Sequence, residues 1–111
     1  MTTVNVTVEF EVAEGADFEF EQESVLDELF NLESVSSSVS DAGQICDSSR
    51  RFVALSVYAH GPSVDEATAA ALSVIIGAVS QAGSASWVWQ ATHVTPAEVV
   101  EDLEDPQLLS A

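Results

Sequence analysis

The sequence contains no lysine, and two adjacent arginines, Arg50 and Arg51, stand against 19 aspartate and glutamate residues. Internal ion pairs cannot neutralise the resulting formal charge of −17, so nearly all carboxylates must lie in water. Phosphate backbones and anionic membrane surfaces are bound through lysine and arginine. We therefore expect no direct binding of nucleic acid and no binding to membranes. Long-range electrostatics instead favours a basic protein partner.

Cysteine is also scarce, and the single Cys46 excludes an internal disulfide bond and fits a reducing compartment. No apolar run approaches the ~20 residues that span a bilayer, and the first residues have no secretory signal pattern. These absences predict a cytoplasmic protein. Cys46, His60 and His93 are too few and too widely spaced for a zinc site, and no glycine-rich phosphate loop is present. We expect no metal and no cofactor.

The clearest pattern lies at the N-terminus, where Val4 to Val12 alternate strictly with polar residues and predict a strand with one buried face. From Phe18 to Leu32 the apolar spacing becomes helical. A competing interpretation makes Phe18–Glu21 a hairpin strand, with Ser24 capping a shorter helix. The longer helix is the preferred prediction.

The remaining elements follow from similar signals. In chain order they are a serine-rich strand (Val35–Asp41), an irregular stretch (Ala42–Ser49), a central strand apolar in both phases (Arg51–His60), a helix with a capping box at Ser63 to Glu66 and a terminal glycine (Ala67–Gly83), a last strand (Ala85–Val94), and a short helix opened by a second capping box (Thr95–Leu103).

This order predicts an α+β ferredoxin-like β-α-β-β-α-β sandwich, with a four-stranded sheet, two helices on one face and a short C-terminal helix. Strands one and three are expected at the centre of the sheet. The whole chain, 1–111, is interpreted as one domain with a disordered tail over 104–111.

The stretch from Arg51 to Gly83, an apolar strand followed by Ser-Val-Asp-Glu-Ala and an alanine-rich helix, resembles small uncharacterised acidic proteins of actinobacteria and their phages. The tryptophan-containing last strand that closes on His-Val-Thr-Pro-Ala-Glu is similar too. The resemblance implies an actinobacterial or phage origin and no catalytic residue.

Two groups of residues are candidates for interaction. The first is an acidic set on the first strand and the exposed side of the first helix, interpreted as a partner-binding surface: Glu9, Glu11, Glu19, Glu23 and Asp27. The second is Tyr58 with Trp87 and Trp89, a possible sheet interface in a homodimer. The two tryptophans share one phase of the last strand with Ala91 and His93. The preferred interpretation places them in the core beneath the helices, and the alternative places them on the open face of the sheet, where they would form a binding or dimer surface.

His60 and His93 are expected at opposite ends of the sheet, so a shared site is not implied. We therefore predict a non-enzymatic acidic interaction protein that binds a basic protein partner. Three alternatives stay open at this point: a DNA-mimic inhibitor of a nucleic-acid-binding protein, a small enzyme with an unrecognised pocket, and a structural or assembly role.

Overall fold

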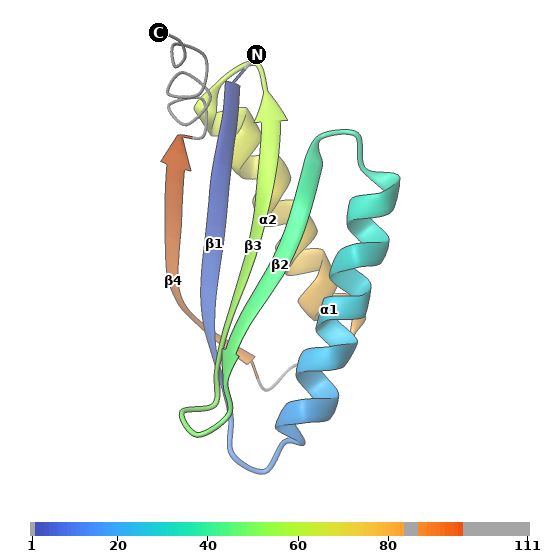
Figure 1. Ribbon diagram of the computed structural model, residues 1–111, viewed down its shortest axis with the longest axis vertical. Helices are drawn as coiled ribbons and strands as arrows, with labels where there is room; N and C mark the ends of the chain where they lie inside the picture. Colours follow the sequence, from blue (N-terminus) through green and yellow to red (C-terminus); the bar gives the residue numbers. More distant parts are fainter. Residues whose placement is uncertain (1, 84–86, 97–111) are drawn as a thin grey trace, which may run out of the picture.

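The computed structural model describes residues 2–83 and 87–96 of the chain. These residues form β1 (Thr2–Val12), α1 (Phe18–Val35), β2 (Val39–Asp47), β3 (Phe52–Gly61), α2 (Val64–Gln81) and β4 (Trp87–Pro96). The strands pair antiparallel in the order β2-β3-β1-β4, and both helices lie on one side of the sheet (Figure 1). The predicted ferredoxin-like fold, with β1 and β3 at the centre, is confirmed.

β1 supplies the middle of the core because every second side chain points toward the helices. Val4, Val6 and Val8 are fully buried, and they continue into the nearly buried Phe10 and Val12. Burial of one such side chain contributes about 1.5–3 kcal/mol. The intervening residues point to the opposite side of the sheet, here called the open face, together with their cross-strand neighbours. The open face carries Thr3, Asn5, Thr7, Glu9 and Glu11 of β1.

α1 begins at Phe18, as the longer-helix prediction required. Its N-cap is Asp17, whose carboxylate accepts a hydrogen bond from the backbone N–H of Phe20 at 3.2 Å. The helix continues to Val35, so the strand predicted at Val35–Asp41 is misplaced, and β2 occupies most of the stretch predicted to be irregular. Backbone pairing with the central β3, rather than apolar alternation in β2 itself, determines where this edge strand lies.

α2 is placed close against the end of β3. A Cβ at Gly61 would lie 2.9 Å from the backbone nitrogen of Ala67, so no side chain fits there. The hydroxyl of Ser63 caps the helix by accepting from the N–H of Glu66 at 3.2 Å. Gly83, with φ of 73°, takes the left-handed conformation that follows the helix. These local signals agree with the sequence prediction.

The turn between β1 and α1 is held by one arginine. The guanidinium of Arg51 donates to the carbonyl oxygens of Val12, Ala13 and Ala16 at 2.9, 2.9 and 2.6 Å. It also lies 5.7 Å from the ring centroid of Phe18, at the start of α1. One of the two arginines is thus committed to the fold.

The C-terminal predictions fall largely beyond β4. Thr95 and Pro96, which were predicted to open a short helix, are the last two residues of β4. The rest of that helix and the tail over 104–111 lie outside the described residues. Neither of the two described helices is long and apolar enough to cross a membrane.

Candidate functional site: an apolar pocket between α2 and β4

The two helices cover the four strands unevenly. α2 packs mainly on β3 and β1, and α1 packs mainly on α2 and β2, so the edge strand β4 has little helical cover. A pocket of about 370 Å³ opens between α2 and β4 on this side of the sheet. Its lining includes Phe10 of β1, Ile76, Val79 and Ser80 of α2, and Trp87 and Trp89 of β4.

A β-bulge in β4 explains why both tryptophans line this pocket. Trp87 and Trp89 pair with Val12 and Phe10, so they face the helices. The register then shifts between Glu9 and Phe10 of β1, and Gln90 is the extra residue on β4. From Ala91 onward the odd-numbered residues of β4 face the other way. The prediction that Trp87, Trp89, Ala91 and His93 share one face is therefore wrong.

The aromatic side chains form a continuous wall. The ring of Phe10 lies 5.4 Å from that of Trp87 and 6.1 Å from that of Trp89, both in tilted arrangements. Trp87 is 7% exposed and forms the floor, whereas Trp89 is 43% exposed and stands at the rim. Tilted aromatic pairs add stability beyond the burial of their area. The wall is thus buried at Trp87 and exposed to solvent at Trp89.

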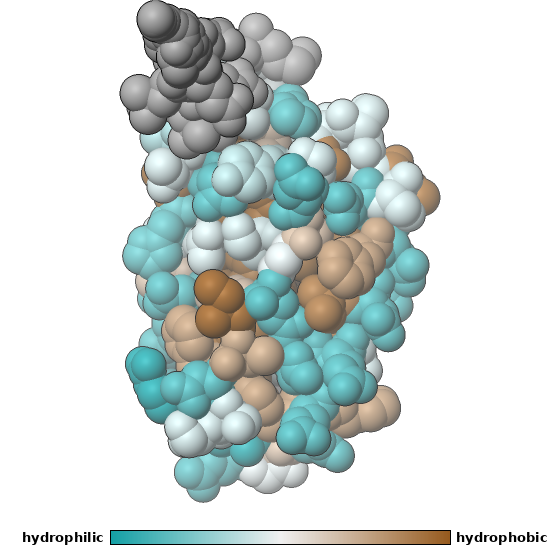
Figure 2. Space-filling model, viewed as in Figure 1, coloured by the Kyte–Doolittle hydropathy of each residue, from teal (hydrophilic) through white to brown (hydrophobic). Residues whose placement is uncertain are grey.

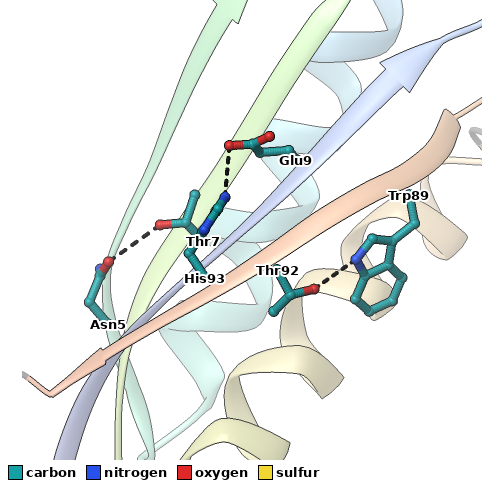
Figure 3. Close-up of polar contacts among 6 residues, drawn as sticks. All are labelled: Asn5, Thr7, Glu9, Trp89, Thr92 and His93. Carbon is teal, nitrogen blue, oxygen red and sulfur yellow. Dashed lines mark hydrogen bonds and ion pairs between the residues drawn. The ribbon is translucent and has the colours of Figure 1, made fainter.

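Both indole N–H groups already have acceptors within the protein. Trp87 donates to the carboxylate of Glu21 on α1 at 3.1 Å. Trp89 donates to the hydroxyl of Thr92 at 2.7 Å, and Figure 3 draws this second bond. The tryptophans therefore present their rings, and not their donors, to the pocket. Among the described lining residues, the hydroxyl of Ser80 is the polar side-chain group. The pocket offers contact area and π faces rather than an acid or a base.

The two histidines lie on the open face, and the prediction about their positions is wrong. His60 pairs with Thr3 and His93 pairs with Thr7 on the two sides of β1, because β3 and β4 run in the same direction. The two histidines therefore lie toward the same end of the sheet, four positions of β1 apart. His60 contacts the hydroxyls of Thr3 at 3.0 Å and Ser40 at 3.5 Å.

His93 belongs to a different set of contacts. Its Nε2 lies 2.9 Å from a carboxylate oxygen of Glu9, as Figure 3 shows beside the bond between Asn5 and Thr7. The two histidines occupy different strands and different hydrogen-bonded groups. They do not form one site.

The predicted acidic set is divided between the two layers. Glu19, Glu23 and Asp27 are exposed on α1, whereas Glu9 and Glu11 project from the open face of the sheet. Of the predicted sheet-interface residues, Tyr58 lies on the open face and the two tryptophans do not. Self-association through the open face stays a prediction. That face is mostly hydrophilic, with apolar patches near its middle (Figure 2).

Cys46 lies within β2 rather than in a polar loop. Its thiol is exposed and contacts Gln22 of α1 and Gln44 of the same strand. Within residues 2–83 and 87–96, no group of three or more histidine, cysteine, aspartate or glutamate side chains could hold a metal ion.

Asp47 stands out among the carboxylates. Its carboxylate accepts a hydrogen bond from the hydroxyl of Ser49 at 2.7 Å and another from the backbone N–H of Ser49 at 3.1 Å. The bond from the hydroxyl is the largest influence, and it lowers the pKa of Asp47 below its ordinary value of 3.8. Backbone hydrogen bonding and the charge of Arg50 act in the same direction, and burial acts against them.

Comparison with known proteins bears on the fold. No family model matches the chain, and no curated protein does. The structure is similar to a solved structure from Chloroflexus aurantiacus J-10-fl, described as a "putative Antibiotic biosynthesis monooxygenase", with a TM-score of 0.57. The superposition covers 86% of this chain and 92% of that chain, at 12% sequence identity. The likeness shows the fold.

The prediction of a non-enzymatic acidic protein that binds a basic partner is wrong. The chain shares its fold with a structure described as a monooxygenase, and it holds an apolar pocket of the size that ligands occupy. The accompanying expectation that the chain is not an enzyme has no support from this likeness, which concerns the fold alone. Of the alternatives, a small enzyme with an unrecognised pocket agrees best with these observations.

Sequence reasoning missed the pocket because its lining comes from three elements. The pair of tryptophans is visible in the sequence. The pattern at Ile76, Val79 and Ser80, however, is the same for a helix that lines a pocket as for a helix with a buried face. The bulge that turns the tryptophans toward the helices has no proline or glycine beside it that would predict it from the sequence. The pocket becomes visible only when the register of β4 is known.

Proposed function

We propose that this chain is a small-molecule-binding, enzyme-like domain whose pocket between α2 and β4 takes an apolar, planar ligand. The observation that carries the proposal is the wall of Phe10, Trp87 and Trp89, whose indole donors are satisfied internally while Trp89 remains 43% exposed. An aromatic ligand stacks on such a wall without leaving a buried donor unpaired.

Volume and charge narrow the ligand further. The pocket, at about 370 Å³, lies at the lower end of the ~300–1,000 Å³ range of ligand sites, which suits two or three fused rings. A chain with a formal charge of −17 repels anions over long distances, and the described lining offers a cation no carboxylate, so we expect a neutral ligand. The hydroxyl of Ser80 offers one polar contact for orientation.

Binding can be tested with 2-naphthol, a neutral two-ring probe, by following tryptophan fluorescence during titration. Two isoleucines provide a matched pair, since Ile76 lines the pocket and is 44% exposed, whereas Ile45 is 71% exposed on the open face. Ile76→Ala should weaken binding by about fivefold, because it removes roughly 1 kcal/mol of apolar contact. Ile45→Ala should leave binding unchanged.

Replacing Trp89 with leucine should reduce affinity more than Ile76→Ala does, and tryptophan fluorescence from Trp87 still reports binding in that variant. Equal losses from Ile76→Ala and Ile45→Ala would show non-specific adsorption and would refute the proposal. Saturable binding that is unaffected by either pocket variant would place the ligand elsewhere.

The description of the structural neighbour indicates which reaction to assay first. We expect a bound aromatic compound to be oxygenated, with consumption of dissolved oxygen in the presence of a reductant. An oxygen electrode measures this directly, and Trp89→Leu serves as the control. The described lining holds no titratable side chain, so the pocket itself supports binding and positioning rather than proton transfer.

A further inference from the structure

A second pocket lies on the open face, on the other side of the sheet from the tryptophan wall. Its volume is about 300 Å³, and its lining comprises Glu9, Glu11, Arg50, Phe52 and Gln90. It combines charges of both signs with one aromatic ring. The proposed function above neither uses nor requires it.

The strand register brings these side chains together. Glu9 and Glu11 are two residues apart on β1, so both project from the open face, and Phe52 of β3 is paired with Glu11. Gln90 is the extra residue at the bulge of β4, beside the same part of β1. Arg50 comes from the turn between β2 and β3, and its guanidinium lies 5.3 Å from the ring centroid of Phe52.

The two arginines of the chain have different tasks. Arg51 donates to three carbonyl oxygens and holds a turn, whereas Arg50 extends over an aromatic ring at the edge of this pocket. Arg50 lines the same hollow as two carboxylates and yet forms no ion pair with a side chain among residues 2–83 and 87–96. Side chains of opposite charge therefore line this pocket without forming an ion pair with one another.

The carboxylate of Glu9 is held in place from the side. Its oxygen lies 2.9 Å from Nε2 of His93, and its side chain is 32% exposed. A carboxylate whose position is fixed in this way loses less conformational entropy when it receives a ligand than a freely rotating one does. Glu11, on the adjacent position of the same face, is exposed.

We propose that this pocket binds a small zwitterion of the α-amino-acid type. The ammonium group binds between the carboxylates of Glu9 and Glu11, and the ligand carboxylate binds the guanidinium of Arg50. An apolar ligand side chain lies beside Phe52. A purely cationic ligand would leave the guanidinium of Arg50 without a partner, and a purely anionic one would be repelled by both glutamates and by the net charge of the chain.

The test uses three probes that share the leucine side chain and differ in charge: L-leucine, its methyl ester and N-acetyl-L-leucine. Titration calorimetry on the full chain should show saturable binding of L-leucine at millimolar concentration or below. The ester, which is only a cation, and the acetylated form, which is only an anion, should each bind at least about tenfold more weakly, because each loses one charge-assisted contact.

Two variants test the assigned contacts, and a third is a matched control. Arg50→Gln and Glu11→Gln should each weaken L-leucine binding by about tenfold or more, with unchanged circular dichroism spectra. Glu19→Gln makes the same charge change on α1 and should leave the affinity unchanged.

Several results would overturn the proposal. These are absence of saturable L-leucine binding to the parent chain, binding of the ester as tight as that of the amino acid, or an equal loss from Glu19→Gln. Binding of 2-naphthol in the pocket between α2 and β4 should be unaffected by Arg50→Gln, so this proposal and the proposed function can fail independently.

Discussion

Replacing Arg51 with glutamine removes the side chain that holds the β1–α1 turn. Its guanidinium donates to the carbonyl oxygens of Val12, Ala13 and Ala16, and it lies over the ring of Phe18. Glutamine has a shorter side chain with one donor group, so it can keep at most one of these contacts. Arginine and glutamine at position 51 take the same left-handed backbone conformation, with φ of 51°, so the substitution leaves backbone strain unchanged.

The expected loss follows from the number of contacts. A hydrogen bond from a charged donor contributes about 1.5–3 kcal/mol when buried, and values at the low end apply to a half-buried side chain whose acceptors can be rehydrated. Loss of two such bonds, with about 0.5 kcal/mol for the contact with Phe18, gives about 3.5 kcal/mol. This is a large part of the ~5–15 kcal/mol that stabilises a typical domain.

Urea denaturation followed by circular dichroism measures this difference, and thermal unfolding should show a Tm about 15 °C lower. Arg50→Gln is the matched control, since it removes the same charge from the neighbouring position without breaking any contact to a backbone carbonyl. Equal changes in the free energy of unfolding for the two variants would refute the assignment, because charge alone would then explain both.

Three further predictions concern stability. Gly61→Ala should destabilise the protein by about 1–3 kcal/mol in urea titrations, since its Cβ would meet the backbone of Ala67. Gly43→Ala is the control, because a Cβ at Gly43 meets nothing within 4 Å. Raising NaCl from about 0.01 M to about 1 M should raise the Tm, because the Debye length falls from ~30 to ~3 Å and carboxylate repulsion is screened; a flat response would show that the carboxylates are too dispersed to interact. The lowered pKa of Asp47 means that its ionised form adds stability above pH 3.8, which is lost as the pH falls through the folded-state value. Asp47→Asn should therefore lose this acid-dependent component, and parallel pH–stability curves for the variant and the parent chain would contradict it.

The fold was predictable because its strongest elements carry local signals. Alternation along β1 and the cap at Ser63 are properties of a few consecutive residues, and both match the structure. β2 was misplaced because an edge strand with a weak pattern takes its limits from its neighbour. Val35 is compatible with the last turn of a helix as well as with the start of a strand.

The candidate site was much less predictable, and α2 shows why. Its fully buried face consists of Ala67, Ala71, Ile75 and Ala78, and the three alanines let the helix approach the sheet closely. Val64 and Ile76, which are larger, remain 44% exposed. Hydrophobicity alone would assign the larger residues to the core. The distance between α2 and the sheet determines which side chains of the helix are buried, and that distance is not a local property of the sequence.

The bulge at Gln90 has a consequence for how this chain tolerates change in length. Loss of a single codon beyond the bulge, at Ala91 or Thr92, would leave a strand of nearly the same composition, yet it would exchange the two sides of the residues that follow it in β4. His93 would turn beneath the helices, and Glu9 would lose its contact with it. Aligned by residue type alone, such a variant would look almost identical to the parent, although its open face would have been rebuilt. Loss of Gln90 itself would remove the bulge and keep both sides in place. Deletions beyond Gln90 are therefore expected to be more disruptive than loss of Gln90 itself.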